Sequence, residues 1–272
     1  MTITRKIHDL KRDLSNRYLL TEERHNLHGR LLSITCVEDA EALFNRLLAA
    51  DPKSLDVLDE RLPYWATLWG SALVLANELL GNSHIQPGET ALELGCGLGL
   101  VSAIACLKRA RVTTTDYQPD ALKFARLNCL QIAGTDPETL ILDWRKPPCN
   151  RQYPLLLGAD LVYETRFFDP LINCFDILLA PNGRILFSEP NRELGKPFFD
   201  RLPDAGWAFK LLVEKEAGSV YEIRRIQESE FRIQEKPQLS DTCPPNMANK
   251  LPKEMHQNCP TDTESCIPSI SL

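Results

Sequence analysis

The middle of the chain alternates between short runs of apolar and β-branched residues and longer stretches with helical spacing of apolar positions. The short runs have the length and composition of buried strands, and the longer ones those of helices that pack on a sheet. The predicted strands are TALELG (90–95), RVTTTD (111–116), TLILDW (139–144), YPLLLGADLVY (153–163) and GRILFSEP (183–190). The predicted helices are GLVSAIACLKRA (99–110), QPDALKFARLNCLQIAG (118–134) and DPLINCFDILLA (169–180).

Strands that are separated by helices need crossover connections, and such connections produce a parallel sheet with helices on both faces. In the second helix, Pro119 falls in the first turn and Gly134 at the end, which are the positions that proline and glycine prefer. We therefore expect an α/β protein with a doubly wound, Rossmann-like and mostly parallel sheet.

The pattern divides the chain into three regions. Residues 1–60 combine an alternating stretch (28–37) with a helical one (38–48), and we expect them to form an N-terminal extension or cap. Residues 61–232 form the α/β domain. Residues 233–272 are rich in proline, serine, threonine and asparagine, and they hold too little apolar surface to offset their ordering entropy. We expect them to be a disordered tail.

Charge and hydropathy narrow the choice of partner. The formal net charge of −6 argues against a general affinity for nucleic acid, which needs clustered lysine and arginine. No apolar run is long enough to span a bilayer, so we expect no membrane partner. The N-terminus is basic and amphipathic, but Asp9 and Asp13 favour a surface helix over a mitochondrial transit peptide.

The cysteines point to a reducing compartment. None of the nine forms a C-x-x-C pair, and Cys106, Cys129 and Cys174 lie inside apolar stretches. Such residues are typical of reduced core thiols, so we expect a cytoplasmic protein. Cys243, Cys259 and Cys266 match no zinc spacing, and we expect no bound metal.

A glycine-rich turn follows the first predicted strand. The sequence ALELGCGLGL (91–100) places Gly95, Gly97 and Gly99 between a strand and a helix, with Glu93 just before them. Glycines permit unusual dihedral angles and remove the β-carbons that would block a ligand. A dinucleotide fold requires G-x-G-x-x-G or alanine in the last place, but the sixth position here is Leu100.

Glu93 also favours a ligand without phosphate. A carboxylate beside this turn opposes a pyrophosphate but complements the ammonium and sulfonium groups of S-adenosylmethionine (AdoMet). Asp116 ends the second strand, where an acid commonly accepts hydrogen bonds from ribose hydroxyls. The pattern E-x-G-x-G-x-G resembles the AdoMet-binding signature of class I methyltransferases. This resemblance implies a sheet of seven strands, and it places Asp143 and Trp144 beside the adenine.

Two further segments narrow the resemblance. PYWATLWGSALVLANELL (63–80) and the D-x-x-Y motif in GADLVYE (158–164) are similar to the seven-β-strand lysine methyltransferases, particularly those of the electron-transfer-flavoprotein β-subunit. In that group the motif lies where the acceptor lysine enters, which assigns catalytic roles to Asp160 and Tyr163. Trp69 of the first segment either lines the cofactor cleft or, with Trp65, anchors the core. The turn SEPNR (188–192) resembles an acid-Pro-x-Arg turn of the same group, and it makes Glu189 and Arg192 candidates for lining the acceptor channel.

We therefore expect an AdoMet-dependent N-methyltransferase in residues 61–232 that modifies a lysine of a protein substrate. Two alternatives remain open. One is a small-molecule N- or O-methyltransferase, which a closed apolar pocket would favour over an open acidic cleft. The other is a catalytically silent AdoMet-binding scaffold.

Overall fold

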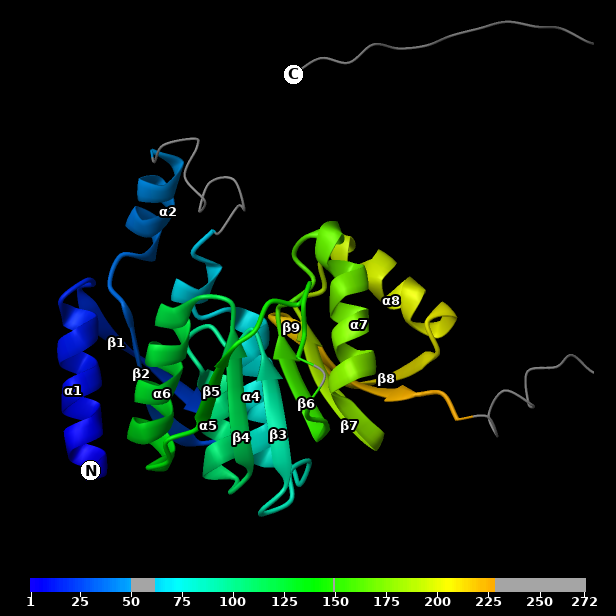
Figure 1. Ribbon diagram of the computed structural model, residues 1–272, viewed down its shortest axis with the longest axis horizontal. Helices are drawn as coiled ribbons and strands as arrows, with labels where there is room; N and C mark the ends of the chain where they lie inside the picture. Colours follow the sequence, from blue (N-terminus) through cyan, green and yellow to red (C-terminus); the bar gives the residue numbers. More distant parts are fainter. Residues whose placement is uncertain (50–61, 149, 228–272) are drawn as a thin grey trace, which may run out of the picture. The chain divides into compact units, whose positions relative to one another are not determined.

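A twisted sheet of seven strands forms the centre of the protein (Figure 1). The computed structural model describes residues 1–49, 62–148 and 150–227. The strands in chain order are β3 (Thr90–Leu94), β4 (Arg111–Asp116), β5 (Glu138–Ile141), β6 (Tyr153–Ala159), β7 (Leu179–Glu189), β8 (Trp207–Lys215) and β9 (Gly218–Arg225). Their order across the sheet is β5-β4-β3-β6-β7-β9-β8, and the first five of these are parallel. β9 runs antiparallel to both β7 and β8, so the mostly parallel sheet that we predicted is confirmed.

Side-chain alternation along the central strands supplies the two faces of the core. On β3, Ala91 belongs to one apolar cluster and Leu92 to the other, and on β6 Leu155 and Leu156 divide in the same way. Successive residues of a strand point to opposite faces, so each of these buried strands contributes to both clusters.

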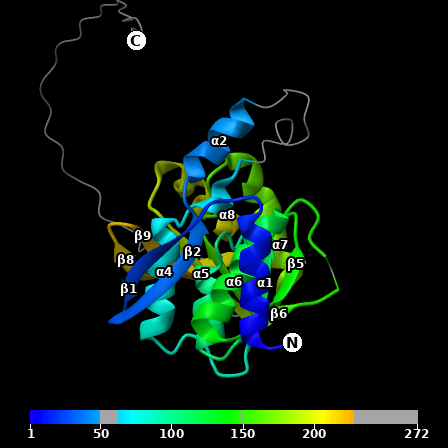
Figure 2. The ribbon, with the colours of Figure 1, turned by 90° about the vertical axis from the view of Figure 1, so that its left-hand side faces the viewer.

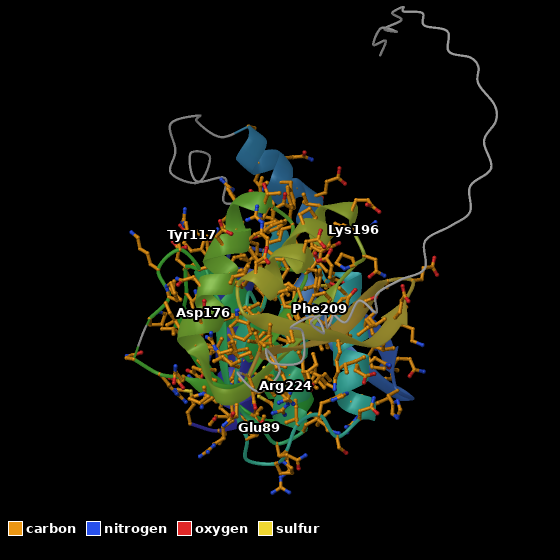
Figure 3. The ribbon with its side chains drawn as sticks, turned by 90° about the vertical axis from the view of Figure 1, so that its right-hand side faces the viewer. Glu89, Tyr117, Asp176, Lys196, Phe209 and Arg224 are labelled. Atoms are coloured by element: carbon orange, nitrogen blue, oxygen red, sulfur yellow. The ribbon has the colours of Figure 1, made fainter. Side chains whose placement is uncertain are left out.

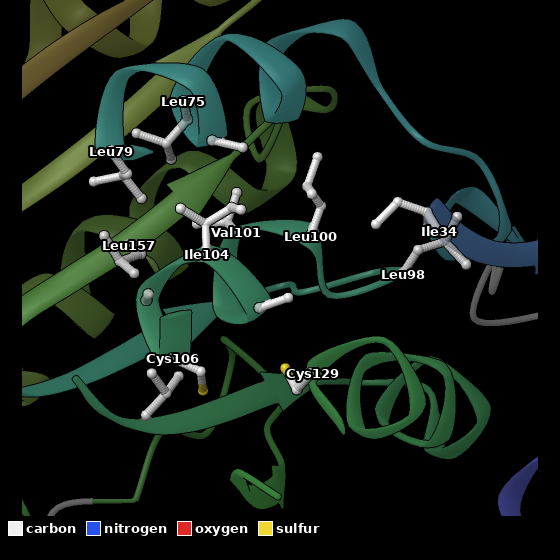
Figure 4. Close-up of a cluster of buried hydrophobic side chains, with 14 of the residues drawn as sticks. Ile34, Leu75, Leu79, Leu98, Leu100, Val101, Ile104, Cys106, Cys129 and Leu157 are labelled. Atoms are coloured by element: carbon white, nitrogen blue, oxygen red, sulfur yellow. The ribbon is translucent and has the colours of Figure 1, made fainter. Parts of the chain in front are cut away.

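Helices cover both faces of the sheet. They are α4 (Gly70–Gly81), α5 (Leu100–Leu107), α6 (Pro119–Ala133), α7 (Phe168–Leu178) and α8 (Lys196–Asp204), with short 3-10 turns η1 (Tyr64–Ala66), η2 (Thr165–Phe167) and η3 (Glu193–Gly195). α4, α5 and α6 pack on one face through the apolar cluster drawn in Figure 4. α7 and α8 cover the other face, which Figure 3 shows with Asp176 of α7 and Lys196 of α8 labelled.

The N-terminal residues add a layer outside α4 and α6 (Figure 2). They form α1 (Ile3–Ser15), the hairpin of β1 (Leu20–Leu27) and β2 (Arg30–Val37), and α2 (Ala40–Leu48). The buried side chain of Asn128 on α6 joins this layer to the domain. It accepts a hydrogen bond from the backbone N–H of Thr35 at 2.8 Å, and it donates to the carbonyls of Thr35 at 3.0 Å and Leu98 at 2.8 Å.

Two strands end three or four residues earlier than the sequence predicts. β6 ends at Ala159 because Asp160 adopts a left-handed φ of 59°. β5 ends at Ile141, and the chain then turns at Asp143, whose backbone oxygen accepts from the N–H of Lys146 at 2.9 Å. Both chain reversals bring polar side chains to the carboxyl edge of the sheet.

Some sequence predictions concern parts of the chain that the structure leaves undescribed. The predicted tail (233–272) and residues 50–61 lie outside the described residues. Within residues 1–49, 62–148 and 150–227, no helix is long and apolar enough to cross a membrane. No group of three or more His, Cys, Asp or Glu in these ranges is arranged to hold a metal ion. Cys106, Cys129 and Cys174 are buried free thiols.

Candidate active site at the carboxyl edge of the sheet

The three glycines after β3 have left-handed backbones, but their surroundings differ. The φ angles of Gly95, Gly97 and Gly99 are 60°, 51° and 78°. A β-carbon on Gly95 would lie 2.8 Å from the Leu161 side chain, and one on Gly99 would lie 2.4 Å from the Ala125 backbone of α6. A β-carbon on Gly97 would lie 3.3 Å from the Trp65 carbonyl oxygen. Gly99 therefore allows α5 to approach α6, whereas Gly95 and Gly97 line a cavity.

This cofactor cavity lies where the strand order reverses, between β3 and β6. Doubly wound sheets bind their ligands at this point. Its charged lining consists of Asp116, Asp143, Asp160, Glu164 and Arg145. Its aromatic lining consists of Tyr64, Trp65, Trp69, Tyr117, Trp144, Tyr163 and Phe167. Three of these carboxylates form ion pairs with arginines: Asp143 with Arg145, Asp160 with Arg192 and Glu164 with Arg166. Asp116 is held by backbone N–H groups instead, and a lining rich in carboxylates opposes a pyrophosphate.

Asp116 is fixed at the end of β4 by backbone donors. Its carboxylate accepts hydrogen bonds from the N–H groups of Gly97 at 3.0 Å and Gln118 at 2.9 Å. Burial raises the pKa of Asp116 to about 6, although these backbone donors oppose the shift. The side chain lines the cofactor cavity, where its remaining acceptor capacity suits ribose hydroxyls.

Asp143 and Trp144 also line the cofactor cavity, in the turn after β5. The Asp143 carboxylate accepts from the backbone N–H of Arg145 at 2.9 Å. The Trp144 indole packs edge-on against Phe167, with ring centroids 5.6 Å apart. The structure therefore brings together the acid and the aromatic ring that the resemblance places beside the adenine.

Glu93 lines neither of the two cavities that contain the other candidate residues, and its contact with the cofactor stays a prediction. Its carboxylate accepts from the backbone N–H of Ser102 on α5 at 2.9 Å and from the Ser102 hydroxyl. Alternation along β3 turns this side chain toward α5, away from the cavity. Complete burial raises its pKa to about 8. Glu93 therefore fixes the start of α5 behind the glycine turn.

The D-x-x-Y residues lie at a second cavity beside the first. This acceptor cavity is lined by Tyr64, Trp69, Asp160, Tyr163 and Arg192. All of these except Arg192 also line the cofactor cavity, so the two cavities adjoin. The arrangement places a carboxylate among aromatic side chains at the junction.

Asp160 is buried and already paired. Its carboxylate accepts two hydrogen bonds from the Arg192 guanidinium, at 2.5 and 3.2 Å, and one from the Ser71 hydroxyl at 3.2 Å. Tyr163 packs against Tyr64 with ring centroids 5.1 Å apart, and burial raises the pKa of its phenol well above the ordinary value.

The two tryptophans of the 63–80 segment divide between core and cavity. Trp65 packs against Tyr18 and Phe124, with ring centroids 5.7 and 5.5 Å apart. Trp69 donates its indole N–H to the Tyr64 carbonyl at 2.9 Å, and its ring lies 5.8 Å from the Arg192 guanidinium carbon. Both residues line the cofactor cavity, but only Trp69 also borders the acceptor cavity.

Sequence reasoning missed several lining residues. Tyr64 borders both cavities, and its place before Trp65 in an aromatic segment was an available signal. Gln118 lies two positions after Asp116, where the chain turns at the strand end. Ser71 lines neither cavity but donates to Asp160, and nothing in the sequence indicates this contact because the two residues are 89 positions apart.

The strand order, the glycine turn and the acids at successive strand ends define a class I AdoMet-dependent methyltransferase. Within this class, the sequence of residues 51–205 matches the lysine methyltransferase family, and the chain belongs to that family. This match confirms the resemblance that we inferred from the motifs, and with it AdoMet as the cofactor.

Curated relatives agree with this family. The chain is 28% identical over 198 residues to the protein N-terminal and lysine N-methyltransferase EFM7 of Cryptococcus neoformans, covering 59% of this chain and 66% of the relative. It is 34% identical over 129 residues to the protein N-lysine methyltransferase METTL21A of Xenopus tropicalis, covering 45% and 59%. It is 28% identical over 135 residues to the electron transfer flavoprotein beta subunit lysine methyltransferase of Rattus norvegicus, covering 48% and 51%. The chain thus spans about half to two thirds of the length of these relatives.

A solved structure of ribosomal protein L11 methylase from Lactobacillus delbrueckii is 20% identical in sequence and superposes with a TM-score of 0.48. The superposition covers 58% of this chain and 79% of that chain. The fold class rests on the strand order described above.

Proposed function

We propose that this protein transfers a methyl group from AdoMet to the side-chain amine of a lysine in a protein substrate. The observation that carries the proposal is the acidic cofactor cavity that adjoins a carboxylate-and-aromatic acceptor cavity. An acidic cleft favours a lysine-bearing protein over a neutral metabolite, and the family and the names of the relatives support the same substrate class.

The cofactor cavity fits AdoMet on grounds of shape and charge. Gly95 and Gly97 leave no β-carbon at its floor, and carboxylates outnumber cations in its lining. In the proposed complex, Asp116 accepts from the ribose hydroxyls, while Asp143 and Trp144 lie beside the adenine. AdoMet, when bound, supplies a methyl group on a sulfonium sulfur.

The acceptor cavity would attract and orient the lysine ammonium through the Asp160 carboxylate and the aromatic rings of Tyr64, Trp69 and Tyr163. Exclusion of water from the aromatic walls acts in the opposite direction, because desolvation favours the neutral amine. The nitrogen must lose a proton before it can act as a nucleophile. Holding the acceptor against the cofactor cavity then provides catalysis by proximity.

We further propose a cytoplasmic location. The buried free thiols among the described residues support a reducing compartment. The charge of −6 supports the view that nucleic acid is not the substrate.

Incubation with AdoMet labelled in its methyl group and a cell extract tests this function. We expect acid-stable label on lysine in protein, and about 100-fold less label with Asp160→Asn, because the neutral amide loses the charge that orients the ammonium. Asp169→Asn is the matched control, since Asp169 pairs with Arg201 on the surface at 2.7 Å. Label found only in small molecules, or AdoMet binding without any transfer, would support one of the two alternatives instead.

A further inference from the structure

The acceptor cavity already contains a cation from the protein itself. The Arg192 guanidinium makes a two-pronged ion pair with Asp160, and it lies 5.8 Å from the centre of the Trp69 ring. Its side chain is 34% exposed, whereas that of Asp160 is 5% exposed. A partly exposed cation thus covers a buried carboxylate.

Arg192 and an acceptor ammonium would compete for the same place. A carboxylate beside aromatic rings is a site for an alkylammonium, through charge-assisted hydrogen bonds and cation–π attraction. Arg192 uses both kinds of contact in this structure. A lysine that reaches Asp160 must therefore displace the guanidinium.

A second buried carboxylate lies close to Arg192 in the chain and receives no side-chain hydrogen bond. Glu189 at the end of β7 is 2% exposed, and neither of its carboxylate oxygens has a donor within 3.5 Å among the described residues. Burial and then the charge of Asp160 raise the pKa of Glu189 to about 7, while the charge of Arg192 and its backbone N–H oppose this shift. A buried carboxyl group without a donor is costly, so a donor that moves to it is stabilised there.

The turn after β7 packs closely around Glu189. A β-carbon on Gly195 would lie 3.1 Å from the Glu189 carboxylate oxygen Oε1, so only a glycine lets the turn approach the carboxylate this closely. Asn191, which precedes Arg192, has a left-handed φ of 61°. Glu189 and Arg192 thus belong to one tight turn.

We propose that Arg192 is a two-position switch that admits the acceptor lysine. This inference rests on the proposed function. In the resting protein the guanidinium binds Asp160 and fills the cation position of the acceptor cavity. When an acceptor ammonium takes Asp160, the guanidinium moves to Glu189 and supplies the missing donor. Arg192 is a positioning residue, and the switch favours acceptors whose charge can replace its own.

Binding of n-butylammonium, a mimic of the lysine side chain, tests the switch without any methyl transfer. We expect Arg192→Met to bind it about tenfold more tightly than the parent protein, because the competing cation is gone. Glu189→Gln should bind it about threefold more weakly, because the displaced guanidinium loses its second partner. In the double variant, the effect of Glu189→Gln should vanish, since there is no guanidinium left to displace. Titration calorimetry measures all four affinities.

Arg201→Met is the matched control, and we expect it to bind n-butylammonium like the parent protein. Arg201 pairs with Asp169 at 2.7 Å and lies 5.6 Å from the Phe168 ring, so it makes the same kinds of contact outside the cavities. Circular dichroism verifies the folding of each variant. Arg192→Lys, which keeps the charge but cannot make the two-pronged pair, replaces Arg192→Met if that variant does not fold, with a smaller gain expected.

Two results would overturn the switch. One is equal affinity of the parent protein and Arg192→Met for n-butylammonium. The other is an equal effect of Glu189→Gln with and without Arg192, which would mean that Glu189 acts on the ligand directly. Failure of the proposed function is distinguishable, because it would show as absent methyl transfer to protein whatever the binding results are.

Discussion

Asp116 combines two properties that oppose each other. Burial favours its neutral form and raises its pKa to about 6, whereas the N–H groups of Gly97 and Gln118 favour the carboxylate. A carboxylate in this position accepts hydrogen bonds from a ligand, and a neutral carboxyl does so less well. Affinity for a ribose-bearing ligand should therefore follow the ionisation of this residue.

We expect AdoMet to bind more weakly as the pH falls through about 6. Ligand hydroxyls favour ionised Asp116, so binding is strongest above the pKa of the free protein and is lost as the group protonates. Asp116→Asn should bind about tenfold more weakly at pH 8 and lose this pH dependence. Calorimetry between pH 5 and pH 8 measures both proteins. Parallel pH profiles for the two would contradict a ribose contact at this residue.

For single residues, the sequence predicted where a side chain lies in the fold better than it predicted which side chains it contacts. Asp116 and Asp143 line the cofactor cavity, as expected from acids at strand ends. Glu93 is part of the same pattern, yet it binds Ser102, because the alternation of β3 turns it toward α5. The ion pair of Asp160 with Arg192 could not be predicted either, because it depends on β6 and β7 being neighbours in the sheet and on where each of them ends.

Among the elements, the connection between β3 and α5 shows how backbone shape and packing act together. The left-handed residue Gly99 begins α5, and the absence of its side chain lets this helix lie against Ala125 of α6. Gly88 has a similar φ, 83° against 78°, but no atom lies within 4 Å of where its β-carbon would be. A side chain at Gly88 would therefore cause backbone strain alone, whereas a side chain at Gly99 would cause the same strain and also crowd α6.

We expect Gly99→Ala to lower the free energy of unfolding by about 3 kcal/mol, from left-handed strain and from overpacking against α6. Gly88→Ala should lower it by about 1 kcal/mol, from the strain alone. Urea denaturation of both variants measures the difference. Equal losses of stability would show that α5 can move away from α6 at little cost.

The strands and helices between β3 and β7 were predictable because the periodicity of their apolar residues is strong. The ends of these elements were harder to predict. β6 stops at Ala159 because Asp160 has a left-handed backbone, and the apolar residues on both sides of Asp160 gave no sign of this turn. β8 and β9 were not located individually. β8 has mostly exposed or half-exposed side chains, so it lacks a continuous apolar run.

In the molecule as a whole, one edge of the sheet collects residues from distant parts of the chain. The turns after β3, β4, β5 and β6 supply the glycines and acids of the cofactor cavity, and η1 supplies aromatic rings. The N-terminal layer reaches the same region through Tyr18, which packs on Trp65 and whose hydroxyl donates to the Asp120 carboxylate at 2.5 Å. Tyr18 thus packs against one of the aromatic residues that line the cofactor cavity.

The central claim is that the cavity beside the glycine turn binds AdoMet. Calorimetric titration of AdoMet into the parent protein, Gly97→Val and Gly88→Val tests it most directly. Gly97→Val forces a branched side chain into a left-handed backbone at the cavity floor, whereas Gly88→Val imposes a similar strain in open space. We predict single-site binding by the parent protein and Gly88→Val, and none by Gly97→Val. Equal binding by all three proteins would contradict the account.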